Sequence, residues 1–261
     1  MERSLKNLTA LVCGSTQGIG KATALKLAAL GCRIVILARD ENKLKETLKD
    51  LPKGERKHDF LVADFSNPRQ LKDVINKYIS EGNTINILVN NTGGPQSGPI
   101  IKADILEFTN AFNQHLICNH ILVQAVYPGM IDSGYGRIIN VISTSVKQPL
   151  PNLGVSNTIR GAVANWSKTL ANELGEYGIT VNNVLPGATN TLRLHAIAKV
   201  KADKSGDEVS DIIQEMAEET PMKRIAKAEE IADAIAFLAS PQAAYINGVN
   251  LPVDGGRTKS L

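Results

Sequence analysis

Three glycines near the start of the chain, Gly14, Gly18 and Gly20, have a spacing that suits phosphate binding. An apolar run ends at Cys13 before them, and apolar residues recur with helical period from Ala22 to Leu30 after them. Such a turn exposes backbone N–H groups and the positive dipole end of a helix, and glycine lets a phosphate approach the backbone. The segment predicts a dinucleotide site; the alternative is a plain strand-to-helix turn.

A second candidate lies at Ala38-Arg39-Asp40, directly after the β-branched, apolar run from Arg33 to Ala38. A carboxylate at the tip of this strand would accept hydrogen bonds from a ribose 2′-OH, whereas an arginine beside a neutral residue suits a 2′-phosphate. Arg39 therefore favours NADP(H) over NAD(H) as the cofactor. In the alternative interpretation, Arg39 only caps or solvates the end of the strand.

These residues need a framework that brings several strand ends together. Apolar runs alternate with helical patterns along the chain, which predicts right-handed crossovers, a parallel sheet and a ligand outside the carboxyl ends of the strands. After Arg33–Ala38 we expect, in order, a helix over Glu41–Asp50, a strand over His58–Asp64, a helix over Pro68–Ser80 and strands over Ile85–Asn90 and Arg137–Ser143.

The predicted fold is therefore a single α/β domain over residues 1–261, a Rossmann-type doubly wound parallel sheet of about seven strands with helices on both faces. The last elements expected are a helix over Ala228–Ser240 and a strand over Val249–Val253. Asp64 and the stretch from Asn90 to Pro95 lie at strand ends, where they are candidates for the ligand site or simply turn residues.

Composition excludes several classes of protein. With 43% hydrophobic and 21% charged residues the chain is globular in composition, and no apolar run is long enough for a membrane span. The formal net charge is +3, with basic and acidic residues interleaved, which gives no case for nucleic acid. The three cysteines lack the spacing of metal ligands, which predicts free thiols in a cytoplasmic protein without a metal site. The short charged start, Met1 to Asn7, predicts that there is no export signal.

With these segments in view, the chain resembles the short-chain dehydrogenase/reductase family, in particular its 3-oxoacyl-carrier-protein reductase-like members. The matching motifs are Gly14-x-x-x-Gly18-Ile19-Gly20, Asn90-Asn91-Thr92-Gly93, Pro186-Gly187 followed by Thr191, and Val253-Asp254-Gly255-Gly256. The resemblance covers nearly the whole chain. It implies an NADP(H)-dependent oxidoreductase for a small carbonyl or alcohol substrate, assembled as a homodimer or homotetramer through helices near Ile105–Pro128 and Val155–Tyr177.

The resemblance also implies which residues hold the cofactor. The glycine turn would lie under the diphosphate, Asp64 near the adenine, Asn90 near the adenine-side ribose, and Pro186 to Thr191 around the nicotinamide. The residues implied to bind the cofactor are Gly14, Ser15, Thr16, Gln17, Gly18, Ile19, Gly20, Arg39, Asp64, Phe65, Asn91, Gly93, Pro186, Gly187, Thr189 and Thr191.

The catalytic motif departs from the family pattern. Alignment through Gly161-Ala162-Val163 places Ser156 where the family has its proton-donating tyrosine and Arg160 where it has lysine. A serine hydroxyl is much less acidic than a phenol with a pKa of about 10, and an arginine does not readily give up its proton. Ser143 keeps the position of the serine that binds the substrate carbonyl; alternatively its hydroxyl only satisfies local backbone.

Residues Gln124 to Pro128 fix the alignment of a long predicted helix with the family. This alignment places His115 where the family usually has asparagine. Its ordinary pKa of about 6.5 makes it a candidate proton donor or relay through water. A core or helix-face histidine is the alternative, and Asn119, one helical turn away, is a further candidate for the asparagine. Two hypotheses follow: an oxidoreductase with an altered proton donor, or an inactive NADP(H)-binding protein that acts in sensing or assembly.

The segment 191–224 resembles the substrate-covering insertion of the family. Its sequence predicts two charged amphipathic helices that break near Ser205-Gly206. Arg193 and His195 are candidates to meet an anionic or carbonyl substrate, and a solvated helix face is the alternative.

Overall fold

One seven-stranded sheet organises the protein, with strand order β3-β2-β1-β4-β5-β6-β7 and all six pairings parallel. The computed structural model describes residues 5–260, so Met1 to Ser4 and Leu261 lie outside the described residues. Met1 to Ser4 belong to the segment that was expected to lack an export signal. The strands are β1 Thr9–Cys13, β2 Arg33–Ala38, β3 Asp59–Val62, β4 Ile87–Asn90, β5 Gly136–Val141, β6 Ile179–Pro186 and β7 Asn250–Val253. The predicted doubly wound parallel sheet is confirmed.

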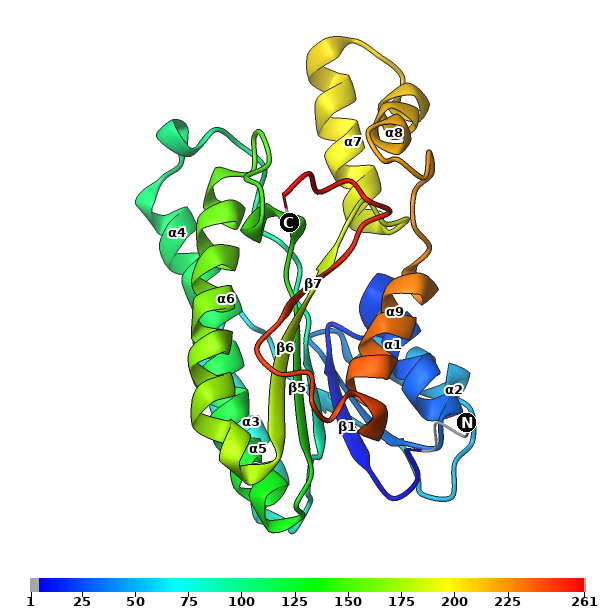
Figure 1. The fold of residues 1–261 in the computed structure, drawn as a ribbon, viewed down its shortest axis with the longest axis vertical. Coiled ribbons are helices and arrows are strands. Elements are labelled where there is room, and N and C mark those ends of the chain that lie inside the picture. Colours follow the sequence, from blue (N-terminus) through cyan, green and yellow to red (C-terminus); the bar gives the residue numbers. More distant parts are fainter. Residues whose placement is uncertain (1–4, 261) are drawn as a thin grey trace.

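Helices cover both faces of the sheet (Figure 1). On one face lie α1 Gly18–Ala29, α2 Glu41–Asp50 and α9 Ala228–Leu238; on the other lie α3 Pro68–Ser80, α4 Ile105–Phe112, α5 Cys118–Asp132 and α6 Gly154–Leu174. Each face has its own apolar core, so the central strands are buried on both sides, as their uninterrupted apolar runs predict. In the described part of the chain, no helix combines the length and apolarity needed to cross a bilayer.

Several element boundaries differ from the sequence prediction for local reasons. The strand predicted over His58–Asp64 ends at Val62, because the Asp64 carboxylate turns the chain by accepting from the Ser66 N–H at 2.8 Å. The strand predicted over Arg137–Ser143 ends at Val141. β6, eight residues long, was not predicted as a strand of its own.

The long helix predicted over Ile105–Pro128 contains an irregular turn. α4 leads into a turn of π-helix, Asn113–Ile117, and α5 then continues past Pro128 to Asp132. Single π-helical turns inside α-helices occur frequently at functional sites. This turn carries His115 and therefore sets the direction of its side chain.

A row of four asparagines crosses the sheet at one level, since Asn90, Asn140, Asn183 and Asn250 are register partners on β4 to β7. Their side-chain amides donate in sequence: Asn90 Nδ2 to Asn140 Oδ1 (2.8 Å), Asn140 Nδ2 to Asn183 Oδ1 (3.0 Å) and Asn183 Nδ2 to Asn250 Oδ1 (2.8 Å). Ser167 of α6 accepts from Asn140 and donates to Asn183, each at 2.8 Å. The amides of Asn140 and Asn183, which are fully or almost fully buried, are thus paired on both sides, whereas Asn90 Oδ1 has no partner among the described residues.

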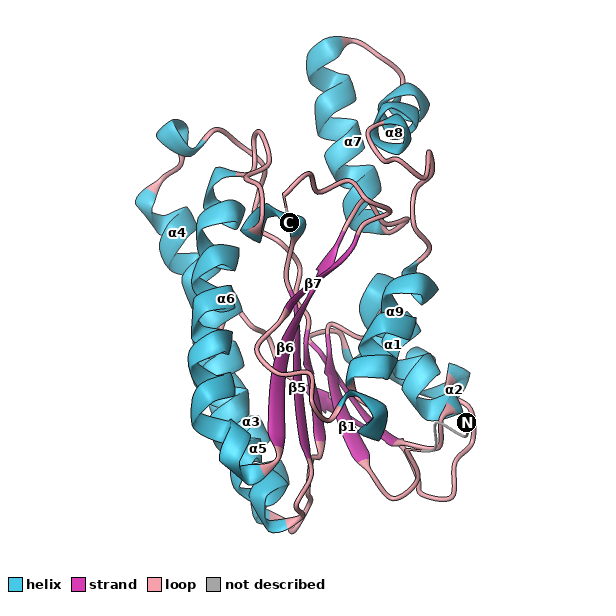
Figure 2. Cartoon of the chain, viewed as in Figure 1, coloured by secondary structure: helices cyan, strands magenta, loops and turns pink. Residues whose placement is uncertain are grey.

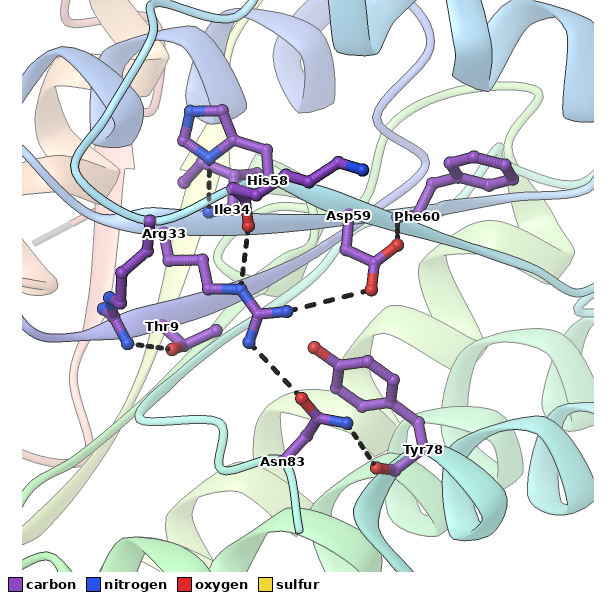
Figure 3. A network of polar contacts seen from close by, with 10 residues as sticks. Thr9, Arg33, Ile34, His58, Asp59, Phe60, Tyr78 and Asn83 are labelled. Carbon is purple, nitrogen blue, oxygen red and sulfur yellow. Dashed lines mark hydrogen bonds and ion pairs between the residues drawn. The ribbon is translucent and has the colours of Figure 1, made fainter. Parts of the chain in front are cut away.

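The strands begin at the opposite edge of the sheet, where polar side chains tie them together (Figure 3). The Arg33 guanidinium donates to Asn83 Oδ1 at 3.4 Å and lies 3.8 Å from the Asp59 carboxylate. His58 Nδ1 accepts the backbone N–H of Ile34 at 3.0 Å. Arg33 and His58 are thus engaged with neighbouring groups at this edge, whereas the open cleft of the protein lies along the edge where the strands end.

Beyond that carboxyl edge stand α7 Leu192–Ser205 and α8 Val209–Glu218, away from the layered body (Figure 2). They meet at Gly206, whose φ of +84° ends α7 at the break that the sequence predicts. Their facing sides form a separate small apolar cluster that includes Leu194, Ala198 and Met216.

Candidate active site

A cleft of about 900 Å³ lies along the carboxyl ends of the strands. This volume is in the upper part of the range of roughly 300–1,000 Å³ typical of cofactor and small-molecule sites. The predicted residues that line it are Gly14, Thr16, Gln17, Gly18, Ile19, Arg39, Asp64, Phe65, Asn91, Gly93, Ser143, Ser156, Arg160, Pro186, Gly187, Thr189 and Thr191. Four other predicted residues do not line the cleft and are buried behind it: Ser15, Gly20, Asn90 and His115.

The glycine turn has a backbone shape that side chains would prevent. Gly14 and Gly18 have φ values of +57° and +53°, and a Cβ on Gly14 would lie 2.5 Å from the backbone oxygen of Asn91. A Cβ on Gly20 would overlap the carbonyl oxygen of Gly14. Gly20 thus packs α1 against β1, while Gly14 and Gly18 face the cleft with no side chain between the backbone and a ligand. A diphosphate fits this cradle.

The loops after β1 and β4 are joined at the centre of the cleft. The Asn91 amide donates to the backbone oxygens of Cys13 and Gly14, at 3.2 and 3.3 Å. β1 and β4 are the neighbouring strands where the strand order reverses direction, which is where doubly wound sheets bind dinucleotides. Asn91 therefore fixes the geometry of the turn and of the loop that carries Thr92 and Gly93.

The end of β2 presents positive charge to the cleft. Arg39 and Lys43 both line it, and Asp40 caps α2 by accepting the Lys43 N–H at 3.1 Å. Within residues 5–260, Arg39 forms no ion pair, so its guanidinium is available to a ligand. Sequence reasoning missed Lys43, although its position in the first turn of the helix that follows Arg39 was a usable signal.

Ser143 and Ser156 both present hydroxyl groups to the cleft. Ser143 Oγ accepts the backbone N–H of Ser145 at 3.1 Å, so it serves the local backbone and still has its own proton to donate into the cleft. Ser156 lies in the first turns of α6, partly exposed, four residues before Arg160 and on the same helix face.

Arg160 is a buried guanidinium at the wall of the cleft, 7% exposed. Its Nη1 donates to the Val141 backbone oxygen at 3.2 Å, and it has no carboxylate partner among the described residues. Burial, and secondarily the charge of Arg193, lowers its pKa to about 10. Arg160 therefore stays positively charged at neutral pH.

His115 lies behind the cleft wall, 1% exposed. Its Nδ1 is 2.5 Å from Thr92 Oγ1, and Thr92 lines the cleft. Burial first, and then the charges of Arg160 and Arg193, lowers the pKa of His115 to about 2, so the ring is neutral at physiological pH. A part for His115 in proton transfer stays a prediction, and it would have to act through Thr92.

Thr92 lines the cleft and contacts His115, but it was not predicted as a site residue of its own. The threonine stands where the family motif has alanine, which was the available signal. Asn119, the alternative to His115, is also buried and does not line the cleft. Of the two candidates on α7, Arg193 lines the cleft, whereas His195 pairs with Asn190 Oδ1 at 3.0 Å outside it.

Comparison with known proteins agrees with this geometry. A family model described as enoyl-(acyl carrier protein) reductase matches residues 14–258. The chain belongs to the short-chain dehydrogenase/reductase family. The chain is 31% identical to the NADPH-dependent reductase BacG of Bacillus subtilis over 255 residues, covering 97% of this chain and 98% of BacG. The resemblance seen in the sequence motifs is thereby confirmed.

Two further relatives show the range of the family. The 3-oxoacyl-[acyl-carrier-protein] reductase FabG of Escherichia coli is 33% identical over 249 residues, covering 95% of this chain and 96% of FabG. The crystal structure of L-sorbose reductase from Gluconobacter frateurii, complexed with NADPH and L-sorbose, superposes with a TM-score of 0.93 at 31% identity, covering 100% of both chains. The family is thus an oxidoreductase family whose members differ in substrate.

Proposed function

We propose that this dehydrogenase/reductase transfers hydride between NADP(H) and a carbonyl or alcohol substrate, a 3-oxoacyl thioester or another small ketone. The observation that carries the proposal is a single cleft that joins the glycine turn, the Arg39 strand end and the hydroxyls of Ser143 and Ser156. Relatives described as NADPH-dependent or complexed with NADPH support the same cofactor.

The chain's own groups fit this cofactor along the cleft. The amides from Gly14 to Ile19 would hold the diphosphate, Arg39 with Lys43 the 2′-phosphate, and Asp64 with Phe65 the adenine side. Pro186 to Thr191 would enclose the nicotinamide. When bound, the nicotinamide supplies or accepts the hydride.

The remaining residues act on the substrate oxygen. Ser143 would donate its hydroxyl proton in a hydrogen bond to the carbonyl, and the fixed charge of Arg160 would stabilise negative charge that develops there. Arg160 keeps its own proton, because its pKa is about 10. We propose that the transferred proton comes from water ordered by Ser156 and by Thr92, whose hydroxyl is oriented by neutral His115, and that bulk solvent protonates the hydroxide left behind.

The second candidate function is non-catalytic binding of NADP(H), in sensing or assembly. The observation that favours it is the pair Ser156 and Arg160, which replaces the tyrosine and lysine of the family. Every cofactor-facing segment described above would serve binding alone equally well.

NADPH oxidation with a panel of ketones and acyl thioesters tests the two functions. We expect wild type to oxidise NADPH with at least one member, and Ser143→Ala to lower kcat/KM roughly 10²- to 10³-fold by removing a donor to the reacting oxygen. Thr158→Ala, on the exposed side of α6, is the matched control. Activity seen only after Ser156→Tyr with Arg160→Lys would instead establish the binding protein.

Arg39→Gln tests the cofactor preference. Because a charge-assisted contact to the 2′-phosphate would be lost, we expect roughly 10- to 100-fold weaker NADPH binding and little change for NADH, measured by fluorescence titration. Arg69→Gln, on the exposed side of α3 and outside the cleft, is the control for the change in net charge. Equal NADPH affinity in both variants would mean that Arg39 only solvates the strand end.

We also propose that the segment 191–224 covers the substrate, since α7 and α8 stand over the open edge of the cleft. The proposed homodimer or homotetramer is supported by exposed apolar side chains on α4 and α5, namely Ile105, Leu106 and Tyr127. The proposed cytoplasmic location is supported by Cys13, Cys32 and Cys118, which are buried free thiols.

A further inference from the structure

The wall that α7 contributes to the cleft is cationic and apolar. Arg193, Lys201 and Lys204 all line the cleft from this helix, beside the apolar side chains of Leu194 and Ile197. None of the three cations forms an ion pair with another residue of the range 5–260. The acid that lines this side, Glu219, is already bound to Arg257. The side chains of α7 therefore leave positive charge uncompensated next to apolar surface.

Arg193 is the member of this group that a hydrogen bond holds against the loop after β4. Its Nη2 donates to the Pro95 backbone oxygen at 2.5 Å, which fixes the side chain across the loop that follows β4. A Cβ on Gly94 would lie 3.3 Å from Nη2 and 3.6 Å from Nε, so the guanidinium lies against a glycine that leaves room for it. This is the one hydrogen bond that Arg193 makes within the described chain, so most of its five N–H donors are free for a ligand.

Arg160 lines the same cleft, and its charge is also uncompensated. Burial is the chief cause of the low pKa values of Arg160 and His115, and the charge of Arg193 lowers both further. The anionic groups of the proposed cofactor have partners elsewhere in the cleft. The glycine turn suits the diphosphate, and Arg39 at the end of β2 suits the 2′-phosphate. Two guanidinium groups that line one cleft without a carboxylate partner favour an anion between or beside them.

We propose that the substrate carries a carboxylate, bound by the guanidinium of Arg193, together with an apolar body that packs under α7. Arginine suits this ligand because its planar fork matches the two oxygens of a carboxylate. The inference rests on the proposed oxidoreductase function, which supplies the carbonyl at Ser143, and adds the chemical class of the molecule around that carbonyl.

The test measures binding without turnover, in the complex with NADP⁺. Isothermal titration first gives the Kd for NADP⁺, and then the Kd values of benzoylformate and 3-benzoylpropionate against those of their methyl esters. We expect at least one acid to bind roughly 10- to 100-fold more tightly than its ester, the range for a hydrogen-bonded charge. Arg193→Gln should reduce this ratio to about one and leave the Kd for NADP⁺ unchanged, with Arg193→Lys between the two. Lys199→Gln, on the same helix but outside the cleft, is the control with the same change in net charge and should keep the wild-type ratio.

The outcomes separate this inference from the proposed function. If NADP⁺ binds but no acid in the panel is preferred over its ester, the carboxylate assignment is wrong and the oxidoreductase proposal stands. A preference that survives Arg193→Gln would also overturn the assignment. Failure of NADP⁺ itself to bind would remove both proposals.

Discussion

Gly20→Ala is expected to abolish NADP(H) binding and to lower the free energy of unfolding by about 3 kcal/mol, the upper part of the usual range for overpacking. The added Cβ would overlap the Gly14 carbonyl oxygen and lie 2.8 Å from the Asn91 amide nitrogen. Both contacts are with atoms that hold the turn, so α1 would have to move away from β1. Urea denaturation and NADPH fluorescence titration measure the two effects.

Two other glycine variants make this prediction falsifiable. Gly161→Ala, in the interior of α6 with open space around the new Cβ, should stabilise the protein by about 0.5–1 kcal/mol and bind NADPH normally. Gly18→Ala should fold, because its Cβ would meet only the Thr191 side chain at 3.1 Å, yet bind NADPH at least roughly tenfold more weakly because of its left-handed backbone and its place in the cleft. Wild-type NADPH binding by both Gly18→Ala and Gly20→Ala would contradict the assignment of the turn to the diphosphate.

His115 is expected to make stability fall with acid, by about 2 kcal/mol between pH 7 and pH 5. Its pKa is about 2 in the folded protein, chiefly because of burial, against about 6.5 in an unfolded chain. Below pH of about 6.5 the unfolded state therefore binds a proton that the native state excludes, which favours unfolding. This destabilisation is absent at pH values above the pKa of His115 in the unfolded chain, and it grows as the pH falls from there toward the pKa in the folded protein.

Denaturant titrations across this pH range measure the effect. His115→Asn should show a shallower loss of stability with acid, because the variant has no imidazole to protonate when it unfolds. His195→Asn is the matched control, since His195 is exposed on α7, and should keep the wild-type slope. Identical slopes for all three proteins would mean that His115 takes up its proton in the native state.

The sequence predicts this fold well where the pattern is local. Runs such as Arg33–Ala38 are apolar throughout, as strands covered on both faces require, and glycine spacing marks the first turn without reference to distant residues. β6 was missed because Asn182 and Asn183 interrupt its apolar run. Their amides are satisfied by other strands and loops, which no local pattern shows.

Site residues were harder to predict where the direction of a side chain decides whether it reaches the cleft. Arg193 and His195 are two residues apart on one helix, and only Arg193 lines the cleft, because positions two apart point to different sides. His115 was expected near a substrate, but the π-helical turn directs it into the protein, onto Thr92. Contacts of this kind depend on packing between elements that are far apart in the sequence.

The asparagine row has a consequence for how the strands find their alignment. In a sheet covered on both faces, neighbouring positions are mostly apolar, so sliding one strand past another by two residues would replace one apolar contact with another. Sliding β5 or β6 would instead leave the buried amides of Asn140 and Asn183 unpaired against apolar side chains. Each unpaired group would cost about 1–3 kcal/mol of stability. Through this penalty, buried amides that do not line the cleft help to set the alignment by which Asn91, Ser143 and Gly187 come to line it together.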